Sequence, residues 1–454
     1  MGALSWDRFQ FAFTITYHYL FPQLTMGLAL LLVVFKLMFL RTRDEAYNNA
    51  AMFWARVFGV NFAVGVVTGI PMEFQFGTNW AAFSNMAGGV IGLSLAMEGL
   101  FAFFAESAFL GIFLYGEKRF GEKIHLLSSI MLLFGSWLSG YFIIVTNAFM
   151  QHPIGYGVAK NGSLYLNQFW AYLLNPWALW EYAHNMTATV ITASFVVAAV
   201  GAFYLLLGRH KKSAAVFLKV ALVSGLIASL IQIFPTGDGQ GKMVATYQKP
   251  TLAAMEGKFH TGNNADLVIL GQPDVSTGKI ENPIRVPYLL SFLAYGTSSA
   301  NVRGLNSFPK NVRPDNVELL YYAYHIMVGL GTLFILILGI GVIMLRNNRL
   351  FSSRPMLWIL MLSFPFPYIA TIAGWMVAEI GRQPWVIYGL MRTAKGISPT
   401  VSGGDTAFTT LGFMGLYTIM GVLFLYMIAK ILTHGPDENS AETPFNSSIP
   451  AQSA

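Results

Sequence analysis

The strongest constraint on the fold of this chain is a series of nine long apolar segments. They lie at about 13–40, 54–74, 92–115, 127–150, 184–207, 216–234, 320–345, 356–378 and 409–432. Each is long enough to cross the hydrocarbon core of a bilayer as a helix, which takes roughly 20 residues. Hydrophobic residues make up 55% of the chain and charged residues 11%, a balance typical of multi-pass membrane proteins. The sequence therefore predicts an all-α fold with nine transmembrane helices.

Positively charged residues predict how these helices are oriented, because Lys and Arg concentrate in the cytoplasmic loops of membrane proteins. The loops on one side carry Arg41, Arg43, Arg56, Lys118, Arg119, Lys123, Arg209, Lys211, Lys212, Arg346, Arg349, Arg354 and Lys430. The short loops on the other side carry only Arg8, Lys160, Arg382, Arg392 and Lys395. We therefore expect a periplasmic N-terminus and a cytoplasmic C-terminus. The net charge of +7 has to be placed relative to the membrane and gives no reason to expect nucleic-acid binding.

The same segments divide the chain into four parts. Residues 1–234 hold helices one to six, and residues 321–432 hold helices seven to nine. Between them, residues 235–320 form a long periplasmic loop rich in Gly and Pro, and a loop of that length is usually functional or disordered. The polar tail, residues 433–454, is expected to be disordered in the cytoplasm.

The composition limits the kinds of metal site. The chain has no Cys, which excludes disulfides, iron–sulfur clusters, thiolate-ligated haem and the C-x-x-C-H attachment of c-type haem. Any metal would have to be held by His, Met or carboxylate groups.

Five side chains of those types lie on five different apolar segments, and the predicted orientation places all of them toward the outer face: His18, Glu98, His184, Met327 and Glu379. Taken singly, a buried His is more often a hydrogen-bonded core residue and a Met is more often packing. Carboxylates near the membrane interior, however, are costly and usually functional. The set predicts a layer of buried ligands beneath the periplasmic surface.

The chemistry of these groups divides them into two kinds. A neutral imidazole and a thioether form the axial pair of a low-spin, electron-transferring haem, and His184 and Met327 suit that role. A lone imidazole or a carboxylate leaves iron able to take an exogenous ligand such as O2. His18, Glu98 and Glu379 suit this second role.

Five short motifs contain these residues. They read "TITYHYLFPQLTMG" around His18, "AMEGLFAFFAES" around Glu98 and Glu106, "WEYAHNM" around His184, "HIMVGLG" around Met327, and "GWMVAEIGRQPW" around Glu379. Together they resemble subunit I of the cytochrome bd-type quinol oxidases, including the cyanide-insensitive branch. The resemblance extends from about residue 4 to residue 432.

The resemblance implies an enzyme of aerobic respiration in the bacterial inner membrane. It would oxidise ubiquinol or menaquinol at the periplasmic side and reduce O2 to water, and this electron transport would generate a proton-motive force without pumping. The implied cofactors are haem b558, haem b595 and haem d, with a haem b in place of haem d as the alternative. The implied partners are subunit II, in a heterodimer, and a small single-helix accessory subunit.

The resemblance also implies roles for individual residues. Those matching His184 and Met327 bind low-spin haem b, while His18, Glu98 and Glu379 jointly serve the two high-spin haems. Arg382 would pair with haem propionates, as suits a planar guanidinium. Trp375 would pack on a macrocycle, and its alternative is an aromatic residue at the membrane interface.

Proton transfer is expected along the third apolar segment. Glu98 and Glu106 are eight residues apart, which places them within roughly 80° on one helix face. Glu106 is expected near mid-bilayer as a proton-relay group, with a buried structural role as the alternative. Ser107 and Ser139 could extend the path, although small polar residues are also ordinary in helix packing.

The quinol site is expected in the long loop, where "KPTLAAMEG" matches the family. Glu256 is the candidate acceptor for a quinol proton, and a solvated loop residue is the alternative. Many members have a Lys directly before "LAA", whereas this chain has Thr251 there and Lys249 two residues earlier. His325 stands where other members have a basic residue, near the low-spin haem.

Two other functions are compatible with the composition. A proton-coupled secondary transporter would use the carboxylates as a relay, but transporters usually show repeated halves and none is evident here. A cytochrome b that passes electrons to another protein would leave Glu98 and Glu379 without a role.

Overall fold

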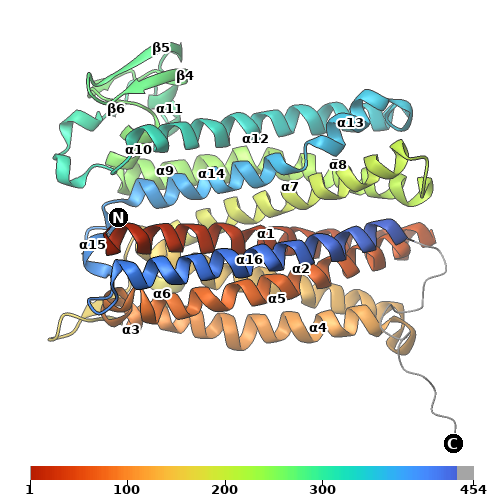
Figure 1. Cartoon of the computed structure of the whole chain (residues 1–454). Helices are drawn as coiled ribbons and strands as arrows, with labels where there is room; N and C mark the ends of the chain where they lie inside the picture. The colour runs from red at the N-terminus through yellow and green to blue at the C-terminus, as the bar shows by residue number, and fades with distance from the viewer. Residues whose placement is uncertain (1, 437–454) are drawn as a thin grey trace, which may run out of the picture.

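The computed structural model describes residues 2–436, which form a bundle of long helices (Figure 1). Within those residues, nine stretches of helix are long and apolar enough to cross a membrane. They are Ala3–Thr42, Glu45–Thr78, Ala81–Tyr115, Arg119–Gln151, Phe169–Leu206, Lys211–Tyr247, Val317–Arg346, Arg354–Arg382 and Gly403–His434. The prediction of nine spanning helices is confirmed, and the side of the membrane that each end faces stays a prediction.

The elements of these spans follow one another in chain order. They are α1 (Ala3–Thr42), α2 (Glu45–Thr78), α3 (Ala81–Met97), the π-helical turn η1 (Glu98–Phe103), α4 (Phe104–Tyr115), α5 (Glu117–Gln151), α6 (Phe169–Leu173), α7 (Pro176–Leu206), α8 (Lys211–Ile231), the π-helical turn η2 (Gln232–Gly237), α9 (Asp238–Tyr247), α12 (Val317–Arg346), α13 (Arg354–Leu362), α14 (Pro365–Arg382) and α16 (Gly403–His434). Gly121 has φ +79° inside α5, so residues 117–120 form a separate turn before the long helix.

Short elements connect the spans at the two ends of the bundle. The strands are β1 (Tyr156–Val158), β2 (Leu164–Leu166), β3 (Gly262–Asn263), β4 (Leu267–Asp274), β5 (Lys279–Val286), β6 (Asn301–Val302), β7 (Trp385–Ile387) and β8 (Met391–Arg392). They pair as four antiparallel two-stranded sheets, β1 with β2, β3 with β6, β4 with β5 and β7 with β8. The remaining helical elements are α10 (Lys249–Met255), α11 (Leu289–Tyr295), η3 (Leu305–Ser307), η4 (Lys310–Val312), η5 (Leu350–Ser352) and α15 (Thr393–Gly396).

Most helices begin earlier than the apolar runs, because polar residues cap them outside the apolar stretch. The side chain of Asn175 accepts from the amide of Trp177, directly before a Pro at the start of α7. Ser402 and Asp405 form a reciprocal capping box at the start of α16. Such caps satisfy amides that would otherwise lack partners.

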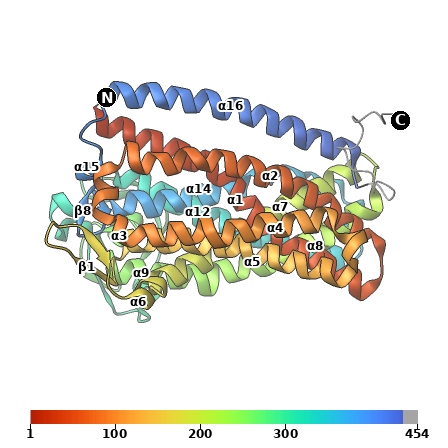
Figure 2. The ribbon, with the colours of Figure 1, turned by 90° about the horizontal axis from the view of Figure 1, so that it is seen from below.

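The arrangement places the loop elements and the N-terminus at the same end of the bundle (Figure 1). The spans run side by side, and the β4–β5 hairpin, α10 and α11 cover that end. The helix α16 lies along the edge, against α1 and α2 (Figure 2), and only 6% of its most apolar window is buried. Its apolar side chains therefore face outward, as a helix in contact with lipid or another membrane protein requires.

The long outer loop is folded rather than extended. The π-helical turn η2 of the sixth span is followed by α9, so this span continues to Tyr247. Beyond it, the amide of Leu305 donates to the carbonyl of Lys258 at 2.7 Å, and His325 of α12 contacts the carbonyl of Val268 in β4 at 2.9 Å. The first bond joins two parts of the loop, and the second holds the loop against α12. The predicted disordered tail begins within α16, which ends at His434, and residues 437–454 lie outside the described part of the chain.

Buried apolar side chains form two separate cores at different levels of the bundle. One core contains Leu28 of α1, Phe195 of α7 and Leu338 of α12, toward the end of the bundle where α1 finishes. The other contains Phe83, Phe149 and the loop residues around Leu252, toward the end covered by the loop. Buried polar groups occur between these cores and also toward both ends of the bundle.

Candidate functional site

Four of the predicted ligands lie at the level between the two apolar cores. On their helices, His18 precedes the first core, while Glu98, His184 and Met327 each lie between residues of the two cores. The expected depth of Glu98 is wrong, however. Because α3 begins at Ala81, Glu98 lies midway along the span and not toward its outer end, where it was expected. These four ligands therefore lie at a broader range of depths than a thin layer, while Glu379 lies near the end of α14.

His184 is buried in α7 against the π-helical turn η2. Its Nε2 lies 3.1 Å from the amide nitrogen of Gln232, and its Nδ1 lies 3.4 Å from the hydroxyl of Thr236. A Cβ on Gly237 would stand 3.4 Å from the imidazole ring. Gln232 and Thr236 are both neutral, so these contacts give the ring no charged neighbour. The ring can therefore act as a neutral imidazole ligand.

Met327 packs against the backbone of α14. A Cβ on Gly374 would lie 2.9 Å from the sulfur of Met327, which is closer than a carbon atom can approach without a shift. The next residue, Trp375, meets Tyr19 of α1 edge to face at 5.7 Å, and Tyr19 donates to Asn185 at 2.6 Å. Trp375 therefore contacts α1 from α14, and its role beside a macrocycle or at the membrane interface stays a prediction.

His18 and Glu98 have partners on neighbouring helices. The Nδ1 of His18 lies 3.1 Å from the hydroxyl of Thr68 in α2. Glu98 opens the π-helical turn η1 and accepts from Ser139 of α5 at 2.7 Å. Single π turns inside helices are frequent at functional sites, and both π turns found in residues 2–436 contain or contact a predicted ligand.

Glu379 and Arg382 form an ion pair at the C-terminal end of α14, the end of the bundle that the long loop covers (Figure 1). Asn147 of α5 donates to the other oxygen of Glu379 at 2.7 Å. Arg382 is only 3% exposed, and within residues 2–436 its Nε and Nη1 have no hydrogen-bond partner. A buried guanidinium with unused donors is an arrangement that requires a further acceptor.

A chain of amide side chains joins this ion pair to the outer loop. Asn147 is contacted by Gln151 at 3.4 Å, and Gln248 donates to Gln151 at 2.8 Å. These three residues were not predicted from the sequence, although Asn147 and Gln151 stand one helical turn apart beside an apolar run. Nor was Glu181, which is buried one turn before His184 and has no partner for either oxygen among the described residues.

Glu106 lies deeper than expected. It is buried on α4, about 14 Å from the end of the helix at Tyr115, so it belongs to the half of the bundle away from the long loop and not to its middle. Ser136 of α5 interacts with its carboxyl group. A Cβ on Gly135 would lie 2.8 Å from the amide of Glu106, so glycine is required where α4 and α5 approach each other. Ser107 donates to its own helix, to Phe103 at 2.8 Å.

Glu256 in the outer loop is 3% exposed, so the alternative of a solvated loop residue is wrong. Burial raises the pKa of Glu256 to about 7, and a hydrogen bond with Tyr324 partly opposes this. Its Oε2 has no partner among the described residues. Thr251, at the position where relatives carry Lys, is buried and donates to Gly381 at 2.7 Å, so its hydroxyl is already used within the protein.

The donor set fits haem better than a bare metal ion. Within residues 2–436, no three His, Asp or Glu side chains gather closely enough to bind a metal ion. Instead, single imidazole, thioether and carboxylate groups stand on separate helices, as axial ligands of a macrocycle do. The unused donors of Arg382 fit a propionate group.

Comparisons with known proteins agree with this arrangement and confirm the predicted family. A family model described as cytochrome bd terminal oxidase subunit I matches residues 6–436. Cytochrome bd ubiquinol oxidase subunit 1 of Bacillus subtilis (strain 168) is 35% identical over 449 residues, which cover 97% of this chain and 96% of that protein. Cytochrome bd-II ubiquinol oxidase subunit 1 of Escherichia coli (strain K12) is 31% identical over 510 aligned positions, covering 97% and 99%.

A solved structure shows the same fold. The bd oxidase from Geobacillus thermodenitrificans has a chain that superposes with a TM-score of 0.89 at 31% identity, covering 96% of this chain and 99% of that chain. The chain therefore belongs to the cytochrome bd terminal oxidase subunit I family.

Proposed function

We propose that this chain is the haem-bearing catalytic subunit of a terminal quinol oxidase, a quinol:O2 oxidoreductase that oxidises quinol at the periplasmic side and reduces O2 to water. One observation carries the proposal beyond family membership. Imidazole, thioether and carboxylate groups stand at the level between two apolar cores, on helices that cross the whole bundle. A proton-coupled transporter has no use for a thioether packed against a glycine, and family membership also argues against this alternative.

His184 and Met327 hold the low-spin haem b558 in this proposal, and His18, Glu98 and Glu379 jointly serve the high-spin haem b595 and haem d, or a haem b in place of haem d. When bound, these haems supply electron transfer and O2 chemistry. Neighbouring polar side chains orient the ligand residues: Gln232 and Thr236 contact His184, and Ser139 donates to Glu98. Such contacts fix ring orientation and ligand basicity.

Quinol oxidation is assigned to the outer loop. Glu256 takes the hydroxyl proton of quinol, since its carboxyl group is buried, has one oxygen free and has a pKa raised to about 7. An acid or base whose pKa lies near the working pH is the most effective one for proton transfer. Tyr324, which interacts with Glu256, lies one turn before Met327 on α12. The proton acceptor therefore contacts the helix that carries the low-spin ligand Met327.

Protons for water formation come from the opposite side of the membrane. Glu106 and Glu98 carry them toward the high-spin ligands, with Ser136 and Ser139 as their partners on α5. Protons are released outside and consumed from inside, so turnover is electrogenic and generates a proton-motive force without a pump.

The proposed setting is the bacterial inner membrane, with subunit II as partner in a heterodimer and a small single-helix accessory subunit. The outward-facing apolar side chains of α16 and α12 provide surfaces for lipid or protein contact. Ubiquinol and menaquinol both remain candidate substrates. A cytochrome b that passes electrons to another protein is the competing function.

A reduced-minus-oxidised absorption spectrum of purified enzyme, combined with quinol-dependent O2 uptake, tests the proposal. We expect low-spin and high-spin haem signals together with O2 consumption that requires quinol. A colourless protein would overturn the haem assignment. Haem signals without O2 uptake would instead favour the electron-carrier alternative.

A further inference from the structure

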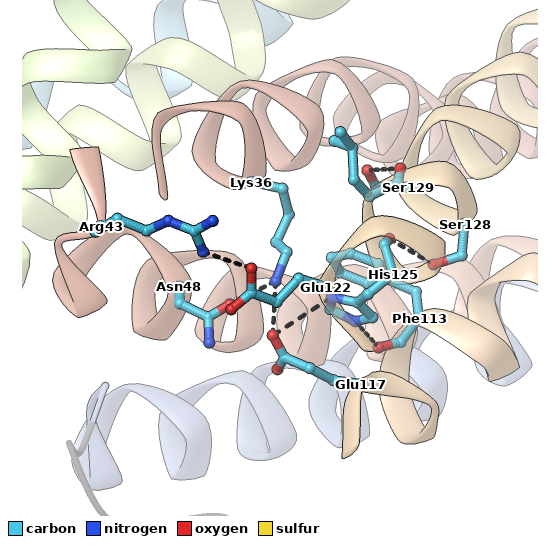
Figure 3. Close-up of polar contacts among 10 residues, drawn as sticks. Lys36, Arg43, Asn48, Phe113, Glu117, Glu122, His125, Ser128 and Ser129 are labelled. Atoms are coloured by element: carbon cyan, nitrogen blue, oxygen red, sulfur yellow. Dashed lines mark hydrogen bonds and ion pairs between the residues drawn. The ribbon is translucent and has the colours of Figure 1, made fainter. Parts of the chain in front are cut away.

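A buried polar cluster at the inner end of the bundle has no part in the function proposed so far (Figure 3). Lys36 of α1 has a fully buried side chain, and its Nζ donates to Asn48 of α2 at 2.6 Å and to Glu117 at 2.7 Å. Glu117 is 25% exposed and begins the short turn before Gly121. The cluster thus joins a buried cation to a carboxylate that reaches the surface.

His125 lies deeper in the bundle than Glu117 and is fully buried. Its Nε2 lies 2.6 Å from the carbonyl of Phe113, and its ring stacks on the Phe113 ring at 4.3 Å. Because a carbonyl only accepts, Nε2 must carry a proton. Nδ1 then has a lone pair in the neutral ring. It is buried without a hydrogen-bond partner among residues 2–436, and it lies 3.7 Å from Glu117 Oε1.

A stripe of hydroxyl groups continues from His125 along one face of α5. Ser129, Ser136 and Ser139 follow at helical spacing, and the first two are almost fully buried. Ser136 interacts with Glu106, and Ser139 donates to Glu98 at 2.7 Å. The stripe therefore ends at the two carboxylates proposed to carry protons.

The stripe has one interruption. Between Ser129 and Ser136 lies the buried Leu132, and the two serines are separated by about 10 Å along the helix axis. The hydroxyl of Ser129 donates to Leu126 at 2.7 Å, which leaves its oxygen lone pairs free to accept. Bridging the gap takes two or three water molecules, each hydrogen-bonding to such groups.

We propose that Glu117 and His125 form the cytoplasmic entry of the proton path that leads along α5 to Glu106 and Glu98. A proton from the inner aqueous phase binds the Glu117 carboxylate, passes to the Nδ1 lone pair of His125, and leaves through water toward Ser129. This inference rests on the proposed function, in which protons are consumed from the inner side.

The surrounding charges suit an entry point. Lys36 fixes the orientation of Glu117 and offsets its negative charge, since a buried ammonium must be paired. Arg43 and Glu122 form an exposed ion pair beside the cluster. Glu45 at the start of α2 is close enough to act electrostatically on Lys36. Glu117 is the carboxylate among these that contacts both Lys36 and His125.

A purely structural role for the cluster makes a different prediction, and two matched substitutions separate the alternatives. His125→Gln keeps a donor for the Phe113 carbonyl but removes the titratable ring. Glu117→Gln keeps an acceptor for Lys36 but cannot carry a proton. Glu122→Gln, which removes an exposed carboxylate at the same surface, is the control.

The experiment measures quinol-driven O2 uptake and proton uptake from the inner side, on holoenzyme in liposomes with a pH-sensitive dye. We expect both substitutions to slow both rates by about tenfold or more, with unchanged haem spectra and with Glu122→Gln at the wild-type rate. External imidazole is expected to restore part of the rate in His125→Gly.

Three outcomes overturn the entry. They are wild-type proton uptake in both variants, loss of haem signals in proportion to the loss of rate, and no rescue of His125→Gly in enzyme that retains its haem. The proposed function fails separately, if wild-type holoenzyme shows no quinol-dependent O2 uptake. An active wild type that is slowed by Glu106→Gln but not by changes at Glu117 and His125 refutes the entry alone.

Discussion

The pH dependence of quinol oxidation follows from the burial of Glu256. The folded protein raises the pKa of this carboxyl group above its ordinary value, to about 7, chiefly by burial. The proton-accepting carboxylate is therefore the minor form below pH 7 and the major form above it. Its fraction rises from about 9% at pH 6 to about 91% at pH 8, a tenfold change. We expect kcat/KM for quinol to rise by that factor over this range.

Glu256→Gln tests the assignment because the amide has nearly the same shape but cannot accept the proton. We expect a loss of about 100-fold or more in kcat/KM and a flat pH profile, with haem content unchanged. Steady-state O2 uptake by holoenzyme at saturating O2 and varied quinol gives both values. Glu281→Gln, an exposed change on β5 of the same loop, is the control. A wild-type profile that is flat through pH 7, or a Glu256→Gln variant with wild-type kcat/KM, would refute the reasoning.

Three further substitutions test other parts of the site. Glu106→Gln should slow O2 reduction by about 100-fold with normal haem spectra, and wild-type O2 uptake in this variant would contradict the relay. Gly374→Ala should push the Met327 sulfur aside, at a cost of about 1–3 kcal/mol from overpacking, and should shift the low-spin absorption; an unchanged spectrum would count against the contact. Arg382→Gln should leave Glu379 without its ion-pair partner and lower haem retention, measured by pyridine haemochrome content, whereas full retention would show that the guanidinium holds no propionate.

The sequence predicted the spanning helices well because apolar length is a local property. It located their apolar cores but not their ends, since caps such as Asn175 and Ser402 lie outside the apolar runs. Because the predicted third span began about 11 residues too late, Glu98 and Glu106 were both expected closer to the start of the span than they are. An apolar window cannot reveal that α3 begins at Ala81, because several polar and small residues precede residue 92.

The candidate ligands were predicted because each lies in a motif, whereas their partners were not. The contacts of His184 with Gln232 and of Glu379 with Asn147 join residues far apart in the chain. Only the fold brings such pairs together. Lys36 shows a signal that could have been used, since a Lys within an apolar run requires a buried partner. The structure supplies that partner in Glu117.

The direct test of the central claim is the visible absorption spectrum of a Met327→Leu variant of the reduced holoenzyme, with His184 unchanged. Leucine fills nearly the same volume but removes the thioether. The account predicts loss or conversion of the low-spin haem signal, with the high-spin signals retained. A wild-type low-spin band in that variant would contradict the assignment of Met327, and with it the proposed position of the low-spin haem between α7 and α12.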